Sequence, residues 1–276
     1  MSAQHGELAG KVAIVTGAGL PGNIGSETAE VLAREGASVV LTDVAGDALV
    51  ETTRALADKG YRVASCVTDI SSEDAVKALI AFTVETFGRL DVIDNNAART
   101  SADQDLLVCD MDVDWWDKTF AVNTRGTMLM CKHAIPVMIH GGGGSIINIS
   151  SGTVVGGNFF STAYASSKGA VETLTRYIAT QYGPQKIRCN AVSPGPVLTS
   201  SLKQGLPDDL REIFRRHTLT GDYAKPSEIG EVVSFLASDR ASFVTGQVLQ
   251  VDGGIAAHLS TSVEIAELMA GGVVPQ

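Results

Sequence analysis

Short apolar runs alternate along the chain with longer segments whose apolar residues recur at helical spacing. The apolar runs contain no regular polar positions, which is typical of strands covered on both sheet faces. They predict seven buried strands, at Val12–Thr16, Ser38–Thr42, Val63–Val67, Val92–Ile93, Ser145–Ile149, Ile187–Val192 and Val248–Val251. The segments between them predict helices at Ser26–Glu35, Asp47–Lys59, Ser72–Phe87, Asp112–Ile139 and Tyr164–Tyr182. This alternation indicates an α/β fold with a parallel, doubly wound sheet flanked by helices.

No internal repeat, low-complexity tract or linker divides the chain. We therefore predict a single Rossmann-type domain over residues 11–254, preceded by a polar N-terminal tail at 1–10. Residues 255–276 form a C-terminal extension, in which Val263–Ala270 is expected to be a short helix. Three alternatives stay open for the extension: a subunit interface, a border of the substrate pocket, or a disordered end.

A glycine-rich turn, Thr16–Gly25, joins the first predicted strand to the first predicted helix. Glycines at such a junction let the backbone approach a pyrophosphate, whose charge then lies at the helix N-terminus. The alternative is a tight connection without a ligand. The nucleotide-binding interpretation assigns the phosphate contacts to Gly17, Gly22, Asn23, Ile24 and Gly25.

Polar residues close the next three strands, at the edge where doubly wound sheets bind ligands. Asp43 would accept hydrogen bonds from the adenosine ribose and repel a 2′-phosphate, which favours NAD over NADP; a helix-capping aspartate is the alternative. Asp69 and Ile70 follow the third strand, where Asp69 could equally cap the next helix. The segment Asn95-Asn96-Ala97 closes the fourth strand.

The sequence Tyr164-Ala-Ser-Ser-Lys168 places a lysine one helical turn after a tyrosine. The unperturbed pKa of tyrosine is about 10, and a nearby ammonium lowers it, so that the phenol can exchange a proton near neutral pH. Ser151 precedes this pair at the end of a predicted strand, where its hydroxyl could polarise the same substrate oxygen. The set predicts acid/base chemistry on an alcohol or a carbonyl group.

The amino-acid composition limits the kinds of partner, cellular compartment and metal site that the chain is expected to have. The formal net charge of the 276-residue chain is −10, which argues against nucleic acid or an anionic membrane as the main partner. The four cysteines are scattered and fit a reduced cytoplasmic interior, and no signal peptide or membrane span is evident. The five histidines lack ligand-like spacing, so we expect chemistry without a metal.

Taken together, these residues resemble the short-chain dehydrogenase/reductase family over roughly Lys11–Gly254. The matching motifs are the turn at Thr16–Gly25, Asp69, Asn95-Asn96-Ala97, Asn123, Ser151, Tyr164-x-x-x-Lys168, Pro194-Gly195 and Asp252-Gly253-Gly254. The resemblance implies a nicotinamide-dependent enzyme and a homotetramer that assembles through the two long central helices.

The resemblance also implies the role of each catalytic residue. Tyr164 would be the acid/base, and Lys168 would lower its pKa and bind the nicotinamide ribose. Ser151 would orient the substrate oxygen. Asn123 would hold a water in a proton relay that leads from Lys168.

The cofactor contacts follow in the same way from the resemblance. Asp69 and Ile70 would frame the adenine, and Asn95 with Ala97 would lie along the adenosine ribose. After the sixth strand, Pro194 and Gly195 would contact the cofactor, and the Val197 backbone and the Thr199 hydroxyl would bind the carboxamide.

The chain departs from the family pattern at three places. Its glycine turn is two residues longer than usual, which leaves open which glycine faces the pyrophosphate. Ala98 stands where glycine is common. Asp94 replaces an apolar residue at the end of the fourth strand, and a buried carboxylate there needs a partner or water.

Two segments are expected to define the substrate. Residues 199–221 would form a lid containing several apolar side chains, and Val154, Val155, Phe159 and Phe160 lie between Ser151 and Tyr164. They favour a hydrophobic alcohol or ketone, alicyclic or steroid-like, although ordinary packing explains them equally well. Three arginines would instead suit an anionic group: Arg99, Arg215 and Arg216.

The sequence therefore predicts an NAD-dependent oxidoreductase that interconverts a secondary alcohol and a ketone. A 3-oxoacyl thioester reductase of the same fold is one alternative, against which Asp43 argues because such reductases usually use NADPH. A catalytically silent NAD-binding sensor is an alternative from a different class.

Overall fold

The structure is a computed structural model that describes residues 6–101, 103–205 and 207–271. Residues 1–5 of the predicted tail, residue 206 of the predicted lid and residues 272–276 of the predicted extension lie outside the described residues.

The seven predicted strands form one parallel sheet with the order β3-β2-β1-β4-β5-β6-β7, which confirms the predicted fold class. The strands are β1 (Val12–Thr16), β2 (Ser38–Asp43), β3 (Val63–Val67), β4 (Val92–Asn95), β5 (Gly144–Ile149), β6 (Ile187–Pro194) and β7 (Val248–Val251). The chain order reverses between β1 and β4, and in doubly wound sheets ligands bind at the carboxyl ends of the strands at such a point.

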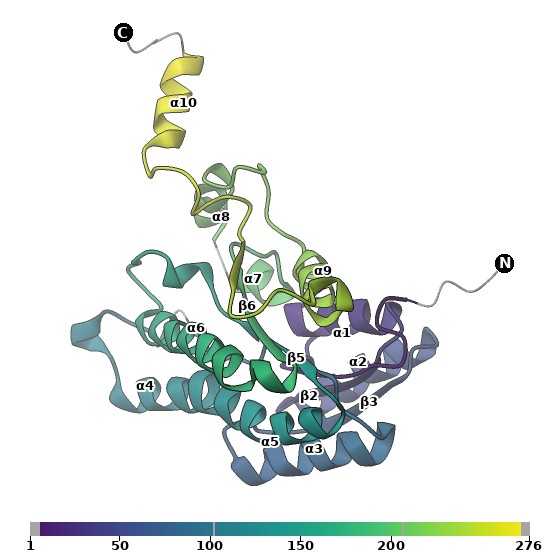
Figure 1. The fold of residues 1–276 in the computed structure, drawn as a ribbon. Coiled ribbons are helices and arrows are strands. Elements are labelled where there is room, and N and C mark those ends of the chain that lie inside the picture. Colours follow the sequence, from purple (N-terminus) through teal and green to yellow (C-terminus); the bar gives the residue numbers. More distant parts are fainter. Residues whose placement is uncertain (1–5, 102, 206, 272–276) are drawn as a thin grey trace, which may run out of the picture.

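Helices cover both faces of the sheet (Figure 1). One apolar core lies under α1 (Ile24–Arg34), α2 (Gly46–Asp58) and α9 (Pro226–Ala237). A second lies on the opposite face, under α3 (Glu73–Phe87), α5 (Thr127–His140) and α6 (Thr162–Tyr182). The central strands are therefore buried on both faces, which explains their apolar runs.

Two helical regions differ from the sequence prediction. Helix α9 was not predicted, although it begins at Pro226 and packs against α1. The predicted helix at 112–139 consists of α4 (Val113–Phe120), one π-helical turn (Ala121–Gly126) and α5. The π turn contains Asn123, and such turns are frequent at functional sites.

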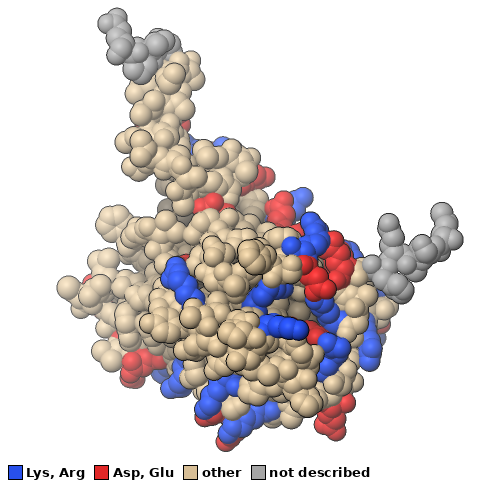
Figure 2. All heavy atoms as spheres, viewed as in Figure 1, with Lys and Arg blue, Asp and Glu red and all other residues tan. Residues whose placement is uncertain are grey.

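The predicted lid contains two short helices, α7 (Ser200–Gly205) and α8 (Asp208–Arg216). In the predicted extension, α10 (Ser262–Ala270) projects away from the sheet (Figure 1), and its visible surface is mostly uncharged (Figure 2). An ion pair between Arg216 and Glu267 joins α8 to α10. Within the described ranges, no helix combines the length and apolar character needed to cross a membrane.

Candidate active site

Tyr164 and Lys168 lie one turn apart in α6, beside the carboxyl end of β5. The Lys168 Nζ lies 5.6 Å from the centroid of the Tyr164 ring. The same Nζ donates a 2.6 Å hydrogen bond to the carbonyl oxygen of Ile149, the last residue of β5. The two side chains therefore lie on one side of the helix, as their spacing predicts.

The protonation of this pair differs from the prediction. Burial raises the pKa of Tyr164, and the Ser151 hydroxyl opposes that shift. Burial lowers the pKa of Lys168 to about 8, and the carboxyl group of Asp94 opposes that shift. The predicted lowering of the Tyr164 pKa is thus not found in the protein alone, because the loss of water from around the phenol has the larger effect.

Ser151 is positioned by the turn that follows β5. Its backbone is extended, and its Oγ accepts hydrogen bonds from the backbone N–H of Thr153 (3.3 Å) and from the Thr153 hydroxyl (3.0 Å). The next residue back, Ser150, donates to Glu172 of α6 at 2.7 Å. These contacts join the serine loop to the helix that carries Tyr164.

Asn123 is 0% exposed, and its side chain is occupied by protein groups. Its Oδ1 accepts from the Arg99 backbone N–H at 2.6 Å, and its Nδ2 donates to the Arg99 carbonyl and to the Ser167 hydroxyl. Ser167 in turn donates to the Tyr164 carbonyl at 2.6 Å. Asn123 therefore links the loop after β4 to the tyrosine helix.

The glycine turn is shaped for close contacts. Gly17 has φ of +67°, and a Cβ there would lie 2.8 Å from the Cα of Ala97. A Cβ on Gly25 would lie 2.3 Å from the Gly17 carbonyl oxygen. Asn96, which the sequence analysis did not assign to the site, supports the turn by donating to the carbonyl oxygens of Thr16 (2.9 Å) and Gly17 (3.1 Å). The turn leads directly into the N-terminus of α1, so these residues fit a pyrophosphate.

Asp43 ends β2 next to this turn. One carboxylate oxygen accepts from the Gly19 N–H at 2.9 Å, and the other accepts from the Ala45 N–H at 3.0 Å. The second contact supports the capping alternative, because Ala45 directly precedes α2. Each carboxylate oxygen has a further lone pair, so both functions are compatible.

The side chains of Asn95 and Asp69 are both engaged by protein groups. Asn95 is 3% exposed and its amide donates to Asn148 of β5 at 2.8 Å, so its side chain is turned into the sheet rather than toward a ribose. Asp69 is exposed and accepts from the backbone and hydroxyl of Ser71, while Ser72 caps α3. Ile70 is buried against Gly126, since a Cβ on Gly126 would lie 2.8 Å from the Ile70 side chain.

The predicted carboxamide segment follows β6. Pro194 ends the strand. Gly195 packs closely on Asp252, since a Cβ on Gly195 would lie 2.6 Å from the Cα of Asp252. Val197 is 7% exposed, and the Thr199 hydroxyl accepts from the Leu202 N–H at 3.0 Å, which caps α7. The sequence motif therefore forms a closely packed junction between β6 and the predicted lid segment.

The predicted lid segment rests on the glycine turn. Ser200 N–H donates to the Gly22 carbonyl at 3.1 Å, and Asn23 Nδ2 donates to the Ser201 hydroxyl at 3.0 Å. Gly22 has φ of +72°, and a Cβ there would lie 2.4 Å from the Ser200 hydroxyl oxygen. Gly22 and Asn23 thus contact the lid as well as the start of α1.

Asp105 was not predicted as a site residue; it lies in the loop between β4 and α4 and is 0% exposed. Its carboxylate accepts hydrogen bonds from the backbone of α6. Nothing local in the sequence signals this contact, because Asp105 and Tyr164 are 59 positions apart.

Within the described part of the chain, no group of three or more His, Cys, Asp or Glu residues could hold a metal ion. The absence of a metal from the chemistry stays a prediction.

Comparison with known proteins identifies the family. A family model described as enoyl-(acyl carrier protein) reductase matches residues 17–256. A Bradyrhizobium diazoefficiens protein named "probable short-chain type dehydrogenase/reductase" is 41% identical over 257 residues, covering 93% of this chain and 91% of the relative. The chain belongs to the short-chain dehydrogenase/reductase family.

Two further proteins resemble this short-chain dehydrogenase/reductase. Cis-4-hydroxycyclohexanecarboxylate dehydrogenase of Sinomonas cyclohexanicum is 41% identical, with 91% of this chain and 98% of the relative covered. A solved structure of 7α-hydroxysteroid dehydrogenase with NADH and 7-oxo glycochenodeoxycholic acid matches with a TM-score of 0.85 at 34% identity, covering 90% of this chain and 94% of the other.

Proposed function

We propose that this short-chain dehydrogenase/reductase is an NAD-dependent oxidoreductase that interconverts a secondary alcohol and a ketone. The observation that carries the proposal is the placement of Tyr164, Lys168 and Ser151 around the carboxyl end of β5, at the same edge of the parallel sheet as the glycine turn. The NADH bound to the structurally similar 7α-hydroxysteroid dehydrogenase supports a nicotinamide cofactor. Such a cofactor accepts or donates the hydride when bound.

The residues of the chain orient the substrate and move its proton. In the oxidative direction Tyr164 accepts the hydroxyl proton as a phenolate, and Ser151 donates a hydrogen bond to the same substrate oxygen. Lys168 favours the phenolate by its charge and binds the nicotinamide ribose. Because the Asn123 side chain is occupied, we assign its proposed contact with a relay water to the backbone carbonyl, which accepts from Thr127 at 2.7 Å and keeps a second lone pair.

The proposed cofactor contacts keep most of the predicted residues. The glycine turn takes the pyrophosphate through Gly17, Gly22, Asn23, Ile24 and Gly25. Backbone groups of Asn95 and Ala97 line the adenosine ribose, since the Asn95 side chain is turned away. Asp69 and Ile70 frame the adenine. The carboxamide binds to the segment that contains Pro194, Gly195, Val197 and Thr199.

Replacing Asp43 by Asn is expected to weaken the preference for NAD over NADP. The substitution removes the charge that repels a 2′-phosphate and weakens the bonds to the ribose, which corresponds to about a tenfold to hundredfold change in relative kcat/KM. The measurement is kcat/KM with each cofactor at a fixed alcohol concentration.

Asp47→Asn is the matched control, because Asp47 is an exposed carboxylate in the first turn of α2. It should leave the cofactor ratio unchanged. If Asp43→Asn behaves like this control, Asp43 only caps α2 and the NAD assignment loses its basis.

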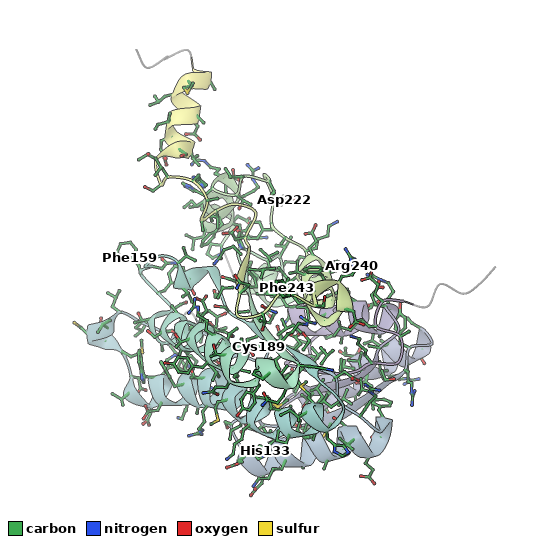
Figure 3. The ribbon with its side chains drawn as sticks, in the orientation of Figure 1. His133, Phe159, Cys189, Asp222, Arg240 and Phe243 are labelled. Carbon is green, nitrogen blue, oxygen red and sulfur yellow. The ribbon has the colours of Figure 1, made fainter. Side chains whose placement is uncertain are left out.

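We further propose a hydrophobic, alicyclic or steroid-like substrate. Apolar side chains are exposed in two places. Those in the loops near the start of α6 are Leu107, Val108, Val155 and Phe159, and those in the predicted lid are Leu210, Ile213 and Leu219. Phe159, labelled in Figure 3, is 87% exposed on the loop before α6. Arg215 and Arg216 pair with Glu212 and Glu267, which weakens the argument for an anionic substrate at the lid. The named activities of the similar dehydrogenases agree with a cyclic alcohol.

Initial rates of NAD reduction across a panel of secondary alcohols test the proposed function. The panel includes steroid, alicyclic and aryl alcohols, polyols and 3-hydroxyacyl thioesters, each with NAD and with NADP. Turnover of a cyclic alcohol with NAD is expected. Turnover restricted to 3-hydroxyacyl thioesters would favour the reductase alternative. NAD binding without turnover would favour the silent sensor.

We further propose that the protein assembles as a homotetramer and that it is located in the cytoplasm. Exposed apolar side chains on α5, namely Met128 and Ile139, agree with pairing through this helix. The molar mass from light scattering is the measurement, and a monomer at micromolar concentration would contradict the proposal.

A further inference from the structure

Helix α6 begins without a cap from its own sequence. Ser161 precedes the helix with φ of +68°, a left-handed conformation that is uncommon outside glycine, and its side chain makes no capping hydrogen bond in the described structure. The first N–H groups of a helix have no partner inside the helix and need one from elsewhere. Tyr164 lies in this first turn, so its own backbone N–H is one of these groups.

Asp105 supplies the missing acceptors from a distant loop. One carboxylate oxygen accepts from the Ala163 N–H at 2.8 Å, and the other accepts from the Tyr164 N–H at 2.9 Å. The Asp105 carbonyl also accepts from the Ser161 N–H at 3.1 Å, which explains how the unusual backbone at Ser161 is stabilised. A carboxylate at a helix N-terminus is favoured by the helix dipole and by charge-assisted hydrogen bonds.

The loop of Asp105 is tied to the helix at a second point. The Thr162 hydroxyl donates to the Leu106 carbonyl at 3.1 Å, and the Asp105 N–H donates to the Ser101 carbonyl at 3.1 Å. The next residues, Leu107 and Val108, are exposed apolar side chains. Asp105 and Leu106 are therefore held against the first turn of α6, which carries Tyr164.

We propose that Asp105 is a positioning residue for Tyr164, which holds the first turn of α6 so that the phenol meets the substrate oxygen. This inference rests on the proposed function of Tyr164. Asp105 holds the backbone nitrogen of the tyrosine itself, so loss of this contact displaces the reacting oxygen directly. A displacement of about 1 Å at a reacting group can lower the rate roughly a hundredfold.

The test compares Asp105→Asn and Asp105→Ala with the wild-type protein. The Asn variant keeps one acceptor oxygen and should lower kcat about tenfold, whereas Ala removes both acceptors and should lower kcat about a hundredfold. The dissociation constant for NAD should change less than about twofold, since the glycine turn is not altered. Circular dichroism and NAD binding identify the variants that are folded.

Asp112→Ala is the matched control. Asp112 caps α4 through an ordinary local bond to the Asp114 N–H at 2.8 Å and is exposed. This variant should lower the melting temperature, as the Asp105 variants do, without lowering kcat. Folded Asp105 variants with wild-type kcat, or a kcat loss in Asp112→Ala that matches theirs at equal melting temperature, would overturn the inference.

The outcomes separate this inference from the proposed function. If the wild-type protein oxidises an alcohol, loses that activity as Tyr164→Phe, and keeps it in folded Asp105 variants, only the positioning role fails. If Tyr164→Phe has wild-type activity, the proposed catalytic assignment fails, and the positioning role of Asp105 fails with it.

Discussion

A Tyr164→Phe variant is expected to lose most alcohol-oxidising activity, with kcat lowered by about a hundredfold to ten thousandfold. The substitution removes the only group proposed to accept the substrate proton, while the ring still fills its place beside Lys168. NAD binding should be retained, because the glycine turn and Asp43 are unchanged. Single-turnover and steady-state rates, together with the NAD dissociation constant, measure both effects.

Tyr177→Phe serves as the control, because Tyr177 lies in the same helix and is 62% exposed. It loses the same hydroxyl group without a proposed role in the reaction and should keep wild-type kcat. A Tyr164→Phe enzyme that still turns over at the wild-type rate would contradict the acid/base assignment.

The second large effect concerns stability and comes from Asp94, which is 0% exposed in β4. Its strand neighbours in register are Val15 and Ile147, and neither carboxyl oxygen has a hydrogen-bond partner among the described residues. Burial raises its pKa from 3.8 to about 8, and the charge of Lys168 opposes the shift. Asp94 is therefore mainly protonated in the folded protein at neutral pH.

The pKa of Asp94 makes stability fall as the pH rises. Above pH 3.8 the unfolded chain releases this proton, whereas the folded protein keeps it until about pH 8. Each pH unit in this window costs about 1.4 kcal/mol, which gives on the order of 4 kcal/mol between pH 4 and pH 7. Asp94→Val should therefore be more stable than the wild type, with a gain that is largest at pH 8 and smallest at pH 4.

Melting temperatures of the wild type, Asp94→Val and Asp94→Asn are measured from pH 4 to pH 8. They separate the effect of the Asp94 charge from the effect of a buried polar group. Both variants remove the titration, but Asn retains a buried polar group without a partner, so its gain in stability should be smaller. A difference between the wild type and Asp94→Val that stays constant from pH 4 to pH 8 would mean that Asp94 is not protonated in the folded state.

Strand positions could be predicted because burial on both faces produces continuous apolar runs, and all seven runs became strands of one sheet. Helix α9 was missed although its signals are local. Pro226 occupies its first turn, Glu228 accepts from the Lys225 N–H at 2.7 Å, and Ile229 and Val233 are buried at helical spacing. The sequence therefore contains the signals of this helix. They were overlooked because the first residues of the helix are polar and follow a long connection.

The parts of the candidate site that could not be predicted depend on contacts between distant segments. The Tyr164–Lys168 spacing is readable because a helix imposes it. The raised pKa of Tyr164 and the orientation of Asn95 depend on burial and on Asn148, which no local pattern encodes. The same holds for Asp105, whose carboxylate acts on a helix that begins far along the chain.

The contact between the lengthened glycine turn and the lid has a consequence for coenzyme exchange. Gly22 and Asn23 hydrogen-bond to Ser200 and Ser201 at the start of the predicted lid, so if this segment opens, it breaks bonds to the segment proposed to hold the pyrophosphate. Lid opening and coenzyme affinity are then thermodynamically linked, and any factor by which one changes the other applies equally in reverse. If the predicted lid moves to admit the substrate, the longer turn ties the residence time of the proposed coenzyme to that motion.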